Sequence, residues 1–306
     1  MSNGFLSRRA AITAGAAAIL GCAVRSAFAQ RGSDAPAARE SSASPEGNTL
    51  NGKTALVTGS TDGLGRAVAL ELAALGASVT VLSRRADALR DVVAALATGD
   101  GREHAFVVAD SDDTEGLGRA VASVAARRRV EILVNNTGGP PGGPMADAPL
   151  DAFNAAFRRH LLANQALLQA VLPGMRAARW GRVVNVVSTS VREPIAGLGV
   201  SNTVRGAVAS WAKTLSRELA PDGITVNNVL PGFTETGRIR QIIGDRAKKE
   251  GRGEDDIRRE MEAAIPARRF ATPDETGGVI AFLCSPAAGY VNGVSLAVDG
   301  GRMVSI

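Results

Sequence analysis

The chain alternates between short apolar runs rich in β-branched residues and longer segments whose apolar residues recur at helical spacing. Such alternation predicts buried strands joined by amphipathic helices. Strands separated by helices require right-handed crossovers and a parallel sheet covered on both faces. The strands are expected at 53–59, 77–83, 104–110, 131–136, 182–188, 223–230 and 293–301. The helices are expected at 63–76, 87–98, 114–126, 151–175, from 201 onward, and at 273–283. The pattern therefore predicts a three-layer, doubly wound α/β fold.

The first residues have the composition of a targeting segment. Arg8 and Arg9 precede an uncharged run over 10–24, and "AFA" at 27–29 is a cleavage signal of the A-x-A type. The uncharged run is too short to span a bilayer comfortably. Paired arginines before such a run are typical of the route that exports folded proteins in bacteria. The sequence thus predicts a twin-arginine signal peptide over 1–29 and a periplasmic protein.

Two alternatives to a periplasmic protein cleaved after residue 29 remain open. "ILGC", which ends at Cys22, resembles a lipoprotein cleavage box and would give a lipid-anchored form. A dispensable tail on a cytoplasmic protein is the other. Residues 30–50, rich in Ser, Ala, Pro and Gly, predict a disordered linker.

Length, charge and cysteine content narrow the class of protein. With 306 residues, 45% hydrophobic and 21% charged, the chain suits one globular domain over 51–306. The formal charge of +5 falls to +2 without the three arginines of the first 29 residues, which is no footprint for nucleic acid. Two cysteines exclude a disulfide framework. The pattern holds no repeat, coiled coil or metal-ligand cluster.

A glycine-rich turn, "TGSTDGLG" at 58–65, lies between the first strand and its helix. Its glycines allow backbone to approach a phosphate closely, and the helix N-terminus supplies N–H donors. Arg84 and Arg85 follow Ser83 at the end of the second strand, where an acid for the ribose of NAD is usual. Arginine can instead clamp a 2′-phosphate, so NADP(H) is favoured over NAD. A solvated helix start is the alternative interpretation of the two arginines.

These motifs occur in order with "NNTG" at 135–138, Ser188 and "PGFTET" at 231–236. Together they resemble the short-chain dehydrogenase/reductase family, in particular the branch with bacterial 3-oxoacyl carrier-protein reductases. The resemblance implies a seven-stranded parallel sheet of order 3-2-1-4-5-6-7, a homotetramer or homodimer, and a small carbonyl or alcohol substrate. The cofactor-binding residues that we expect are Thr58, Gly59, Thr61, Gly63, Leu64, Gly65, Ser83, Arg84, Arg85, Asp110, Asn136, Gly138, Arg205, Pro231, Gly232 and Thr236.

The catalytic positions depart from that family, in which Tyr-x-x-x-Lys follows a serine by thirteen residues and an asparagine lies on the preceding helix. Ser188 is retained, but Ser201 and Arg205 stand where Tyr and Lys would be, and His160 stands at the asparagine. A serine hydroxyl is a much weaker acid than a phenol and is too short to reach the same point. Arg205 can still bind ribose hydroxyls. The single tyrosine, Tyr290, lies near the last strand and cannot replace it.

Three functions are compatible with this departure. The protein transfers hydride with a proton from water, the substrate or another residue; it binds NADP(H) without turnover; or it catalyses a lyase or isomerase step. His160 is the candidate acid, because imidazole titrates near neutral pH, with a structural histidine as the alternative. "SNTVR" at 201–205 together with "NNTGGPP" occurs in some family members, which favours hydride transfer.

Two segments near the predicted cleft complete the picture. "GGPPGGP" at 138–144 predicts a stiffened loop on the nicotinamide side, or else a plain connection. The segment around 233–265 takes the place of the family's substrate lid, and its mixed charge predicts mobility and solvation.

Overall fold

The computed structural model describes residues 49–99 and 101–305. The predicted signal peptide and residues 30–48 of the predicted linker lie outside these residues. Seven parallel strands form one sheet in the order β3-β2-β1-β4-β5-β6-β7, which confirms the predicted topology. The strands are β1 (Thr54–Thr58), β2 (Ser78–Ser83), β3 (Ala105–Val108), β4 (Ile132–Asn135), β5 (Gly181–Val186), β6 (Ile224–Pro231) and β7 (Ser295–Val298).

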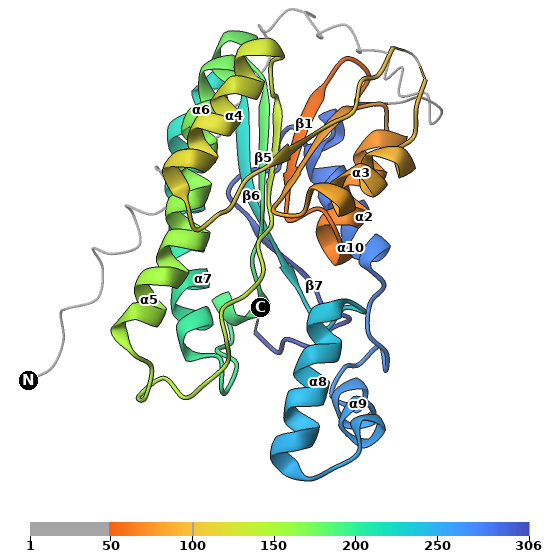
Figure 1. Ribbon diagram of the computed structural model, residues 1–306, viewed down its shortest axis with the longest axis vertical. Helices are drawn as coiled ribbons and strands as arrows, with labels where there is room; N and C mark the ends of the chain where they lie inside the picture. Colours follow the sequence, from red (N-terminus) through yellow and green to blue (C-terminus); the bar gives the residue numbers. More distant parts are fainter. Residues whose placement is uncertain (1–48, 100, 306) are drawn as a thin grey trace, which may run out of the picture. The chain divides into compact units, whose positions relative to one another are not determined.

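Helices cover both faces of the sheet. Figure 1 shows α4, α6 and α7 on one side and α2, α3 and α10 on the other. The α-helices in the described part of the chain are α2 (Gly63–Ala74), α3 (Ala86–Ala95), α4 (Thr114–Arg127), α5 (Leu150–Phe157), α6 (Ala163–Ala178), α7 (Gly199–Leu219), α8 (Gly237–Glu250), α9 (Glu254–Ala263) and α10 (Pro273–Cys284).

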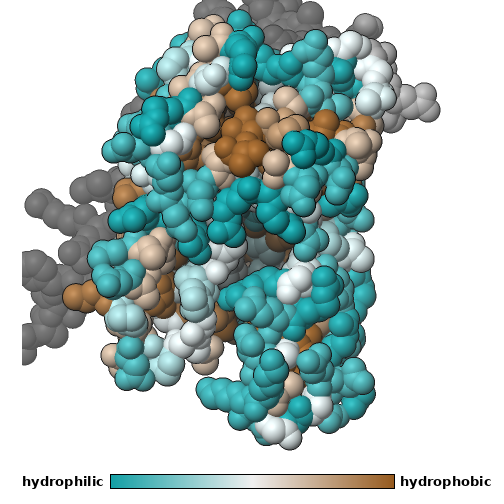
Figure 2. Space-filling view, in the orientation of Figure 1, coloured by the Kyte–Doolittle hydropathy of each residue, from teal (hydrophilic) through white to brown (hydrophobic). Residues whose placement is uncertain are grey.

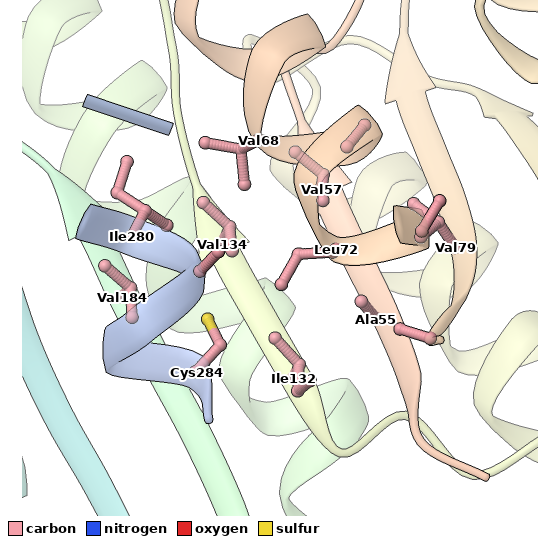
Figure 3. Packing of buried hydrophobic residues seen from close by; sticks show 14 of the residues in the cluster. Ala55, Val57, Val68, Leu72, Val79, Ile132, Val134, Val184, Ile280 and Cys284 are labelled. Carbon is pink, nitrogen blue, oxygen red and sulfur yellow. The ribbon is translucent and has the colours of Figure 1, made fainter. Parts of the chain in front are cut away.

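Alternate residues of the central strands point to opposite faces of the sheet and pack in two separate hydrophobic cores. Val57 and Val134 pack with Leu72 of α2 and Ile280 of α10, and Figure 3 shows part of this cluster. Leu133, the neighbour of Val134, belongs to the opposite cluster under α4 and α6. Both faces of β1, β4 and β5 are therefore buried, as continuous apolar runs of parallel strands require.

The long helical stretch predicted over 151–175 is confirmed, but it does not keep one helical geometry throughout. A π-helical turn, η1 (Arg158–Leu162), joins α5 to α6, and the helical path continues to Ala178. A π turn accommodates one extra residue without breaking the helix, so apolar spacing alone hardly registers it. Its consequence is local, because the buried His160 lies within it.

The segment predicted to be a mobile, solvated lid folds as α8 and α9 around a small apolar core, and its mobility stays a prediction. Ile239 and Ile243 of α8 pack with Ile257 and Met261 of α9 and with Phe270. The charged residues point outward, and Figure 2 shows a mainly hydrophilic surface over this region. Apolar residues four apart among many charges are sufficient to pair two helices, which the overall charge of the segment conceals.

No helix in the described ranges is long and apolar enough to cross a membrane. Within the same ranges no three His, Cys, Asp or Glu side chains come together as a metal site.

Candidate active site

The glycine-rich turn between β1 and α2 has no room for side chains at two of its glycines. Gly59 adopts a φ of +59°, and a Cβ there would lie 2.3 Å from the carbonyl oxygen of Asn136. A Cβ on Gly65 would lie 2.2 Å from the carbonyl oxygen of Gly59. Asn136 fastens the turn from the other side, because its Nδ2 donates to the Gly59 carbonyl at 3.1 Å. The result is a backbone cradle at a helix N-terminus, which suits a phosphate group.

Residues from the neighbouring strands close around this turn. The Thr58 hydroxyl accepts from the Asn136 N–H at 2.8 Å and so links the ends of β1 and β4. From the β6–α8 loop, the Cγ2 atom of Thr236 lies 3.0 Å from the position of a Cβ on Gly63. Leu64 packs against the apolar core below the turn. The predicted cofactor residues of β1, β4 and β6 therefore meet at one edge of the sheet.

The arginines after β2 lie at the same edge and are open to solvent. The side chain of Arg84 is 69% exposed and lies 3.9 Å from the Asp110 carboxylate. Arg85 donates to the hydroxyl of Thr61, in the glycine-rich turn, at 3.5 Å. The structure thus brings Thr61, Arg84, Arg85 and Asp110 together. Asp110 lies two residues beyond the end of β3 rather than within the strand.

His160 is buried in η1 and contacts Thr137, which follows the two asparagines of "NNTG". Its Nδ1 lies 2.6 Å from the Thr137 hydroxyl, and its Nε2 has no partner among the described residues. Burial first, and then the nearby charges of Arg205 and Arg159, lower the pKa of His160 from 6.5 to about 3. The expectation that His160 titrates near neutral pH is therefore wrong, because a buried imidazole among cations stays uncharged.

This lowered pKa predicts a specific loss of stability in acid. The unfolded chain binds a proton on His160 near pH 6.5, whereas the native protein does not until about pH 3. Stability from the uncharged His160 is complete above pH 6.5 and falls as the pH drops. The expected slope is up to about 1.4 kcal/mol of unfolding free energy per pH unit. Urea unfolding of wild type and His160→Gln between neutral pH and about pH 5 measures it; equal slopes in both proteins would contradict the burial argument.

Arg205 of α7 is hydrogen-bonded to the end of β5 and to the loop that follows β4. One terminal nitrogen donates to the Val186 carbonyl at 2.9 Å, the other to the Thr137 carbonyl at 3.5 Å, and Nε has no partner. The residue is only 9% exposed. Burial lowers the pKa of its guanidinium to about 10, with a further contribution from Arg238. Arg205 therefore remains a cation at neutral pH. It contacts Thr137, the residue whose hydroxyl lies against His160.

The carbonyl of Val186 is itself part of a rigid region of the sheet. Asn135, Asn185 and Asn228 are in register on β4, β5 and β6, and their buried amides form hydrogen bonds of 2.8 Å and 3.0 Å. The Nδ2 of Asn228 donates to the Ser295 hydroxyl of β7 at 3.1 Å, which extends this row of hydrogen bonds to a fourth strand. These bonds tie four strands together next to the residue that anchors Arg205.

The two predicted site serines differ in their surroundings. Ser188 follows β5 and caps a short 3₁₀ turn (Thr189–Val191), where its Oγ accepts from the Ser190 N–H at 3.1 Å. Its hydroxyl proton remains available. Ser190 is buried and its Oγ has no partner among the described residues. Ser201 is half-buried in the first turn of α7, one helical turn before Arg205.

Gly138, Pro231 and Gly232 have different settings. A Cβ on Gly138 would meet no atom within 4 Å, so the loop after β4 borders open space there. Pro231 ends β6. A Cβ on Gly232 would lie 2.7 Å from the Cα of Asp299, so this glycine serves close packing of the β6–α8 loop.

Two residues of this site are not among the sequence predictions: Thr137 and Arg238. The threonine in "NNTG" is a visible signal, but its contact with His160 spans 23 positions. Arg238 lies in the second position of α8, and its side chain donates to the Pro140 carbonyl at 3.1 Å. Only the folded chain brings either residue to the site.

Comparisons with known proteins identify the family of the chain. A family model described as enoyl-(acyl carrier protein) reductase matches residues 59–302. The bovine (Bos taurus) protein named dehydrogenase/reductase SDR family member 4 is 33% identical over 258 residues, covering 84% of this chain and 89% of the relative.

Solved structures share the fold over the same extent. The L-sorbose reductase of Gluconobacter frateurii, in complex with NADPH and L-sorbose, has a TM-score of 0.80 at 28% identity, covering 85% of this chain and all of that one. A protein proposed to be an NAD(P)-dependent gluconate 5-dehydrogenase, from Beutenbergia cavernae with NADP at low occupancy, has a TM-score of 0.76 at 34% identity. This match covers 85% of the present chain and 100% of the Beutenbergia chain. The chain therefore belongs to the short-chain dehydrogenase/reductase family.

Proposed function

We propose that the protein is an NADP(H)-dependent oxidoreductase that transfers hydride between the cofactor and a small carbonyl or alcohol substrate. The observation that carries the proposal is the glycine cradle of Gly59 and Gly65, which lies at the same sheet edge as the buried cation Arg205. When bound, the cofactor supplies the hydride that reduces a carbonyl carbon. The related sorbose reductase and gluconate dehydrogenase structures, solved with NADPH or NADP, support the choice of cofactor.

Different residues at and near the turn bind different parts of the cofactor. The backbone of Gly59, Gly63 and Gly65 and the N-terminus of α2 bind the diphosphate. Arg84 and Arg85 bind a 2′-phosphate, because exposed guanidinium groups pair with phosphate through charge-assisted hydrogen bonds. Arg205 donates to ribose hydroxyls through N–H groups that its two carbonyl partners leave unused.

The proton follows a route that differs from the phenol used elsewhere in the family. The short side chain of Ser201 cannot reach the point that a phenol would reach. A threonine hydroxyl is no stronger an acid than serine, but Thr137 is paired with His160, which can replace the proton that the threonine gives up. The Thr137 hydroxyl, 2.6 Å from the His160 Nδ1, donates its proton to the developing alkoxide of the substrate. The neutral imidazole then donates from Nδ1 to the threonine oxygen, and Nε2 takes a proton from a water that enters the site during turnover, because this atom is buried and without a partner among the described residues. The hydroxide that this water leaves behind returns to solvent. An uncharged His160 suits this transfer, because it changes no net charge inside the buried site.

Variants of these residues separate the two candidate donors. We expect Thr137→Val, which keeps the shape and removes the hydroxyl, to lower kcat by about 100-fold, the usual worth of a positioned acid. His160→Gln should lower it similarly, and Ser201→Ala should change it by less than about threefold. The measurement is NADPH oxidation over a panel of aldehydes, ketones and alcohols, with NADPH affinity measured in parallel. Loss of turnover in Ser201→Ala with full activity in Thr137→Val would reverse the assignment.

The absence of a tyrosine at position 201 favours a second candidate, an NADP(H)-binding protein without turnover. Tight NADPH binding with no oxidation by any member of the panel would select it. A lyase or isomerase on this fold would form product without a change at the nicotinamide absorbance.

Export and assembly are further parts of the proposal. We propose that the folded protein passes to the periplasm through its twin arginines with the cofactor already bound, because no nicotinamide pool is available outside the cytoplasm. Full-length, unprocessed protein confined to the cytoplasmic fraction would overturn this.

We also propose a homotetramer or homodimer, supported by the exposed Leu296 on the edge strand β7. Light scattering that gives the monomer mass would contradict it.

A further inference from the structure

Two arginines from different elements converge on one point of the loop that follows β4. Arg205 comes from α7 and Arg238 from α8 of the lid. A terminal nitrogen of Arg205 lies 3.8 Å from the position of a Cβ on Gly139, and one of Arg238 lies 3.9 Å from it. Two cationic groups therefore flank the same glycine next to the candidate active site.

Neither arginine has an acidic partner in the described part of the chain. Arg205 donates to two backbone carbonyls, and Arg238 to the Pro140 carbonyl and the side-chain amide of Gln241. The neighbouring lid arginines behave differently, since Arg246 and Arg258 each pair with two glutamates. Placing two like charges together and burying one of them is unfavourable unless an anion joins them.

The position of the pair separates it from the diphosphate site at the glycine-rich turn. Arg240, two residues after Arg238 on α8, is the lid arginine near that turn. A Cβ on Gly237 would lie 3.8 Å from the guanidinium of Arg240 and close to the carboxylate of Asp62, a residue of the turn. Arg238 instead reaches Pro140, on the loop that the sequence places at the nicotinamide side. The two arginines of α8 thus serve different parts of the cleft.

We propose that Arg205 and Arg238 bind the carboxylate of the substrate over Gly139, so that the substrates are oxo acids and the corresponding hydroxy acids. The inference rests on the proposed function, of which it names the substrate class. A carboxylate can accept two parallel donors from the planar guanidinium of Arg238 and one more from an N–H group of Arg205 that its carbonyl partners and the ribose leave free. Charge-assisted bonds of this kind are the strongest available in such a site. The hydrogen bond from Arg238 to Pro140 places the lid helix where it can complete the site.

The test compares acids with their neutral counterparts. Acetoacetate and acetoacetamide, levulinate and levulinamide, and pyruvate and pyruvamide are titrated into the protein saturated with NADP⁺, and binding is followed calorimetrically. We expect at least one acid to bind tenfold or more tightly than its amide. Arg238→Gln should remove most of this preference and leave the affinity for NADP⁺ unchanged. Lys249→Gln, which removes an exposed cation from the far end of the same helix, is the matched control and should retain the preference.

Each other outcome has a defined meaning. If no acid binds more tightly than its amide, the carboxylate site is overturned, whether or not NADPH is oxidised with neutral ketones. If Arg238→Gln weakens NADP⁺ binding as much as acid binding, the anion at this site is a cofactor phosphate, and the proposal is again overturned. Failure of the wild-type protein to bind NADP⁺ would instead refute the proposed function, independently of the preference for acids.

Discussion

Replacing Gly59 by alanine is expected to weaken NADPH binding by roughly 100-fold or more, because the phosphate cradle depends on backbone that no side chain can share. The Cβ would lie 2.3 Å from the Asn136 carbonyl oxygen, and the residue would keep a φ of +59° that alanine adopts reluctantly. Relief of the contact requires the backbone of β4 to move by about an ångström away from β1. Fluorescence titration of NADPH measures the affinity.

The matched control is Gly278→Ala on α10. This glycine is exposed within the helix, and a Cβ there meets no atom within 4 Å. We expect the control to raise the free energy of unfolding by about 0.5–1 kcal/mol, the difference in helix propensity, and to bind NADPH normally. Normal NADPH affinity in Gly59→Ala would show that the turn does not bind the cofactor.

Replacing Arg205 by methionine is expected to separate stability from activity. The free energy of unfolding should change by less than about 1 kcal/mol, because the two lost hydrogen bonds are offset by removal of a buried charge that has no acidic partner. Turnover should fall by about 100-fold or more, since the only buried cation beside Thr137 in the described residues is lost. Denaturant titration and steady-state kinetics of the same preparations measure the two effects.

Arg205→Lys tests the shape of the cation as well as its charge. A lysine ammonium is a compact point charge and cannot donate from a planar fork to both the Val186 and the Thr137 carbonyl. We expect activity between those of wild type and Arg205→Met, with a weakened affinity for NADPH. A strongly destabilised Arg205→Met that still binds NADPH and turns over at the wild-type rate would assign the arginine a purely structural role.

The strands themselves and the position of the cofactor turn could be predicted from the sequence because both depend on local patterns, whereas the order of the strands was implied by the resemblance to the family. Continuous apolar runs are needed for strands buried on both faces, as Val57 and Val134 show by packing on one face and Leu133 on the other. The spacing from Ser188 to Ser201 and Arg205 follows from chain length along one strand and one helix. Positive φ at Gly59 and Gly63 is a property of the turn itself.

The lid and the acid–base residues could not be predicted in the same way. The apolar pairing of Ile243 with Ile257 is hidden in a segment whose composition is strongly charged. The π turn that holds His160 changes the helical path by one residue, which is below the resolution of a periodicity argument.

The residue pattern by itself predicted the fold class and the phosphate-binding turn, because each depends on neighbouring residues. The strand order, and the interpretation of Ser201 and Arg205 as replacements for a catalytic tyrosine and lysine, came from the resemblance to the family. Only the tertiary structure decided that His160 is uncharged and bound to Thr137, and that Arg205 and Arg238 face one glycine without an acid between them. Protonation and pairing depend on burial and on distances between residues far apart in the chain, and those arise only when the helices pack on the sheet.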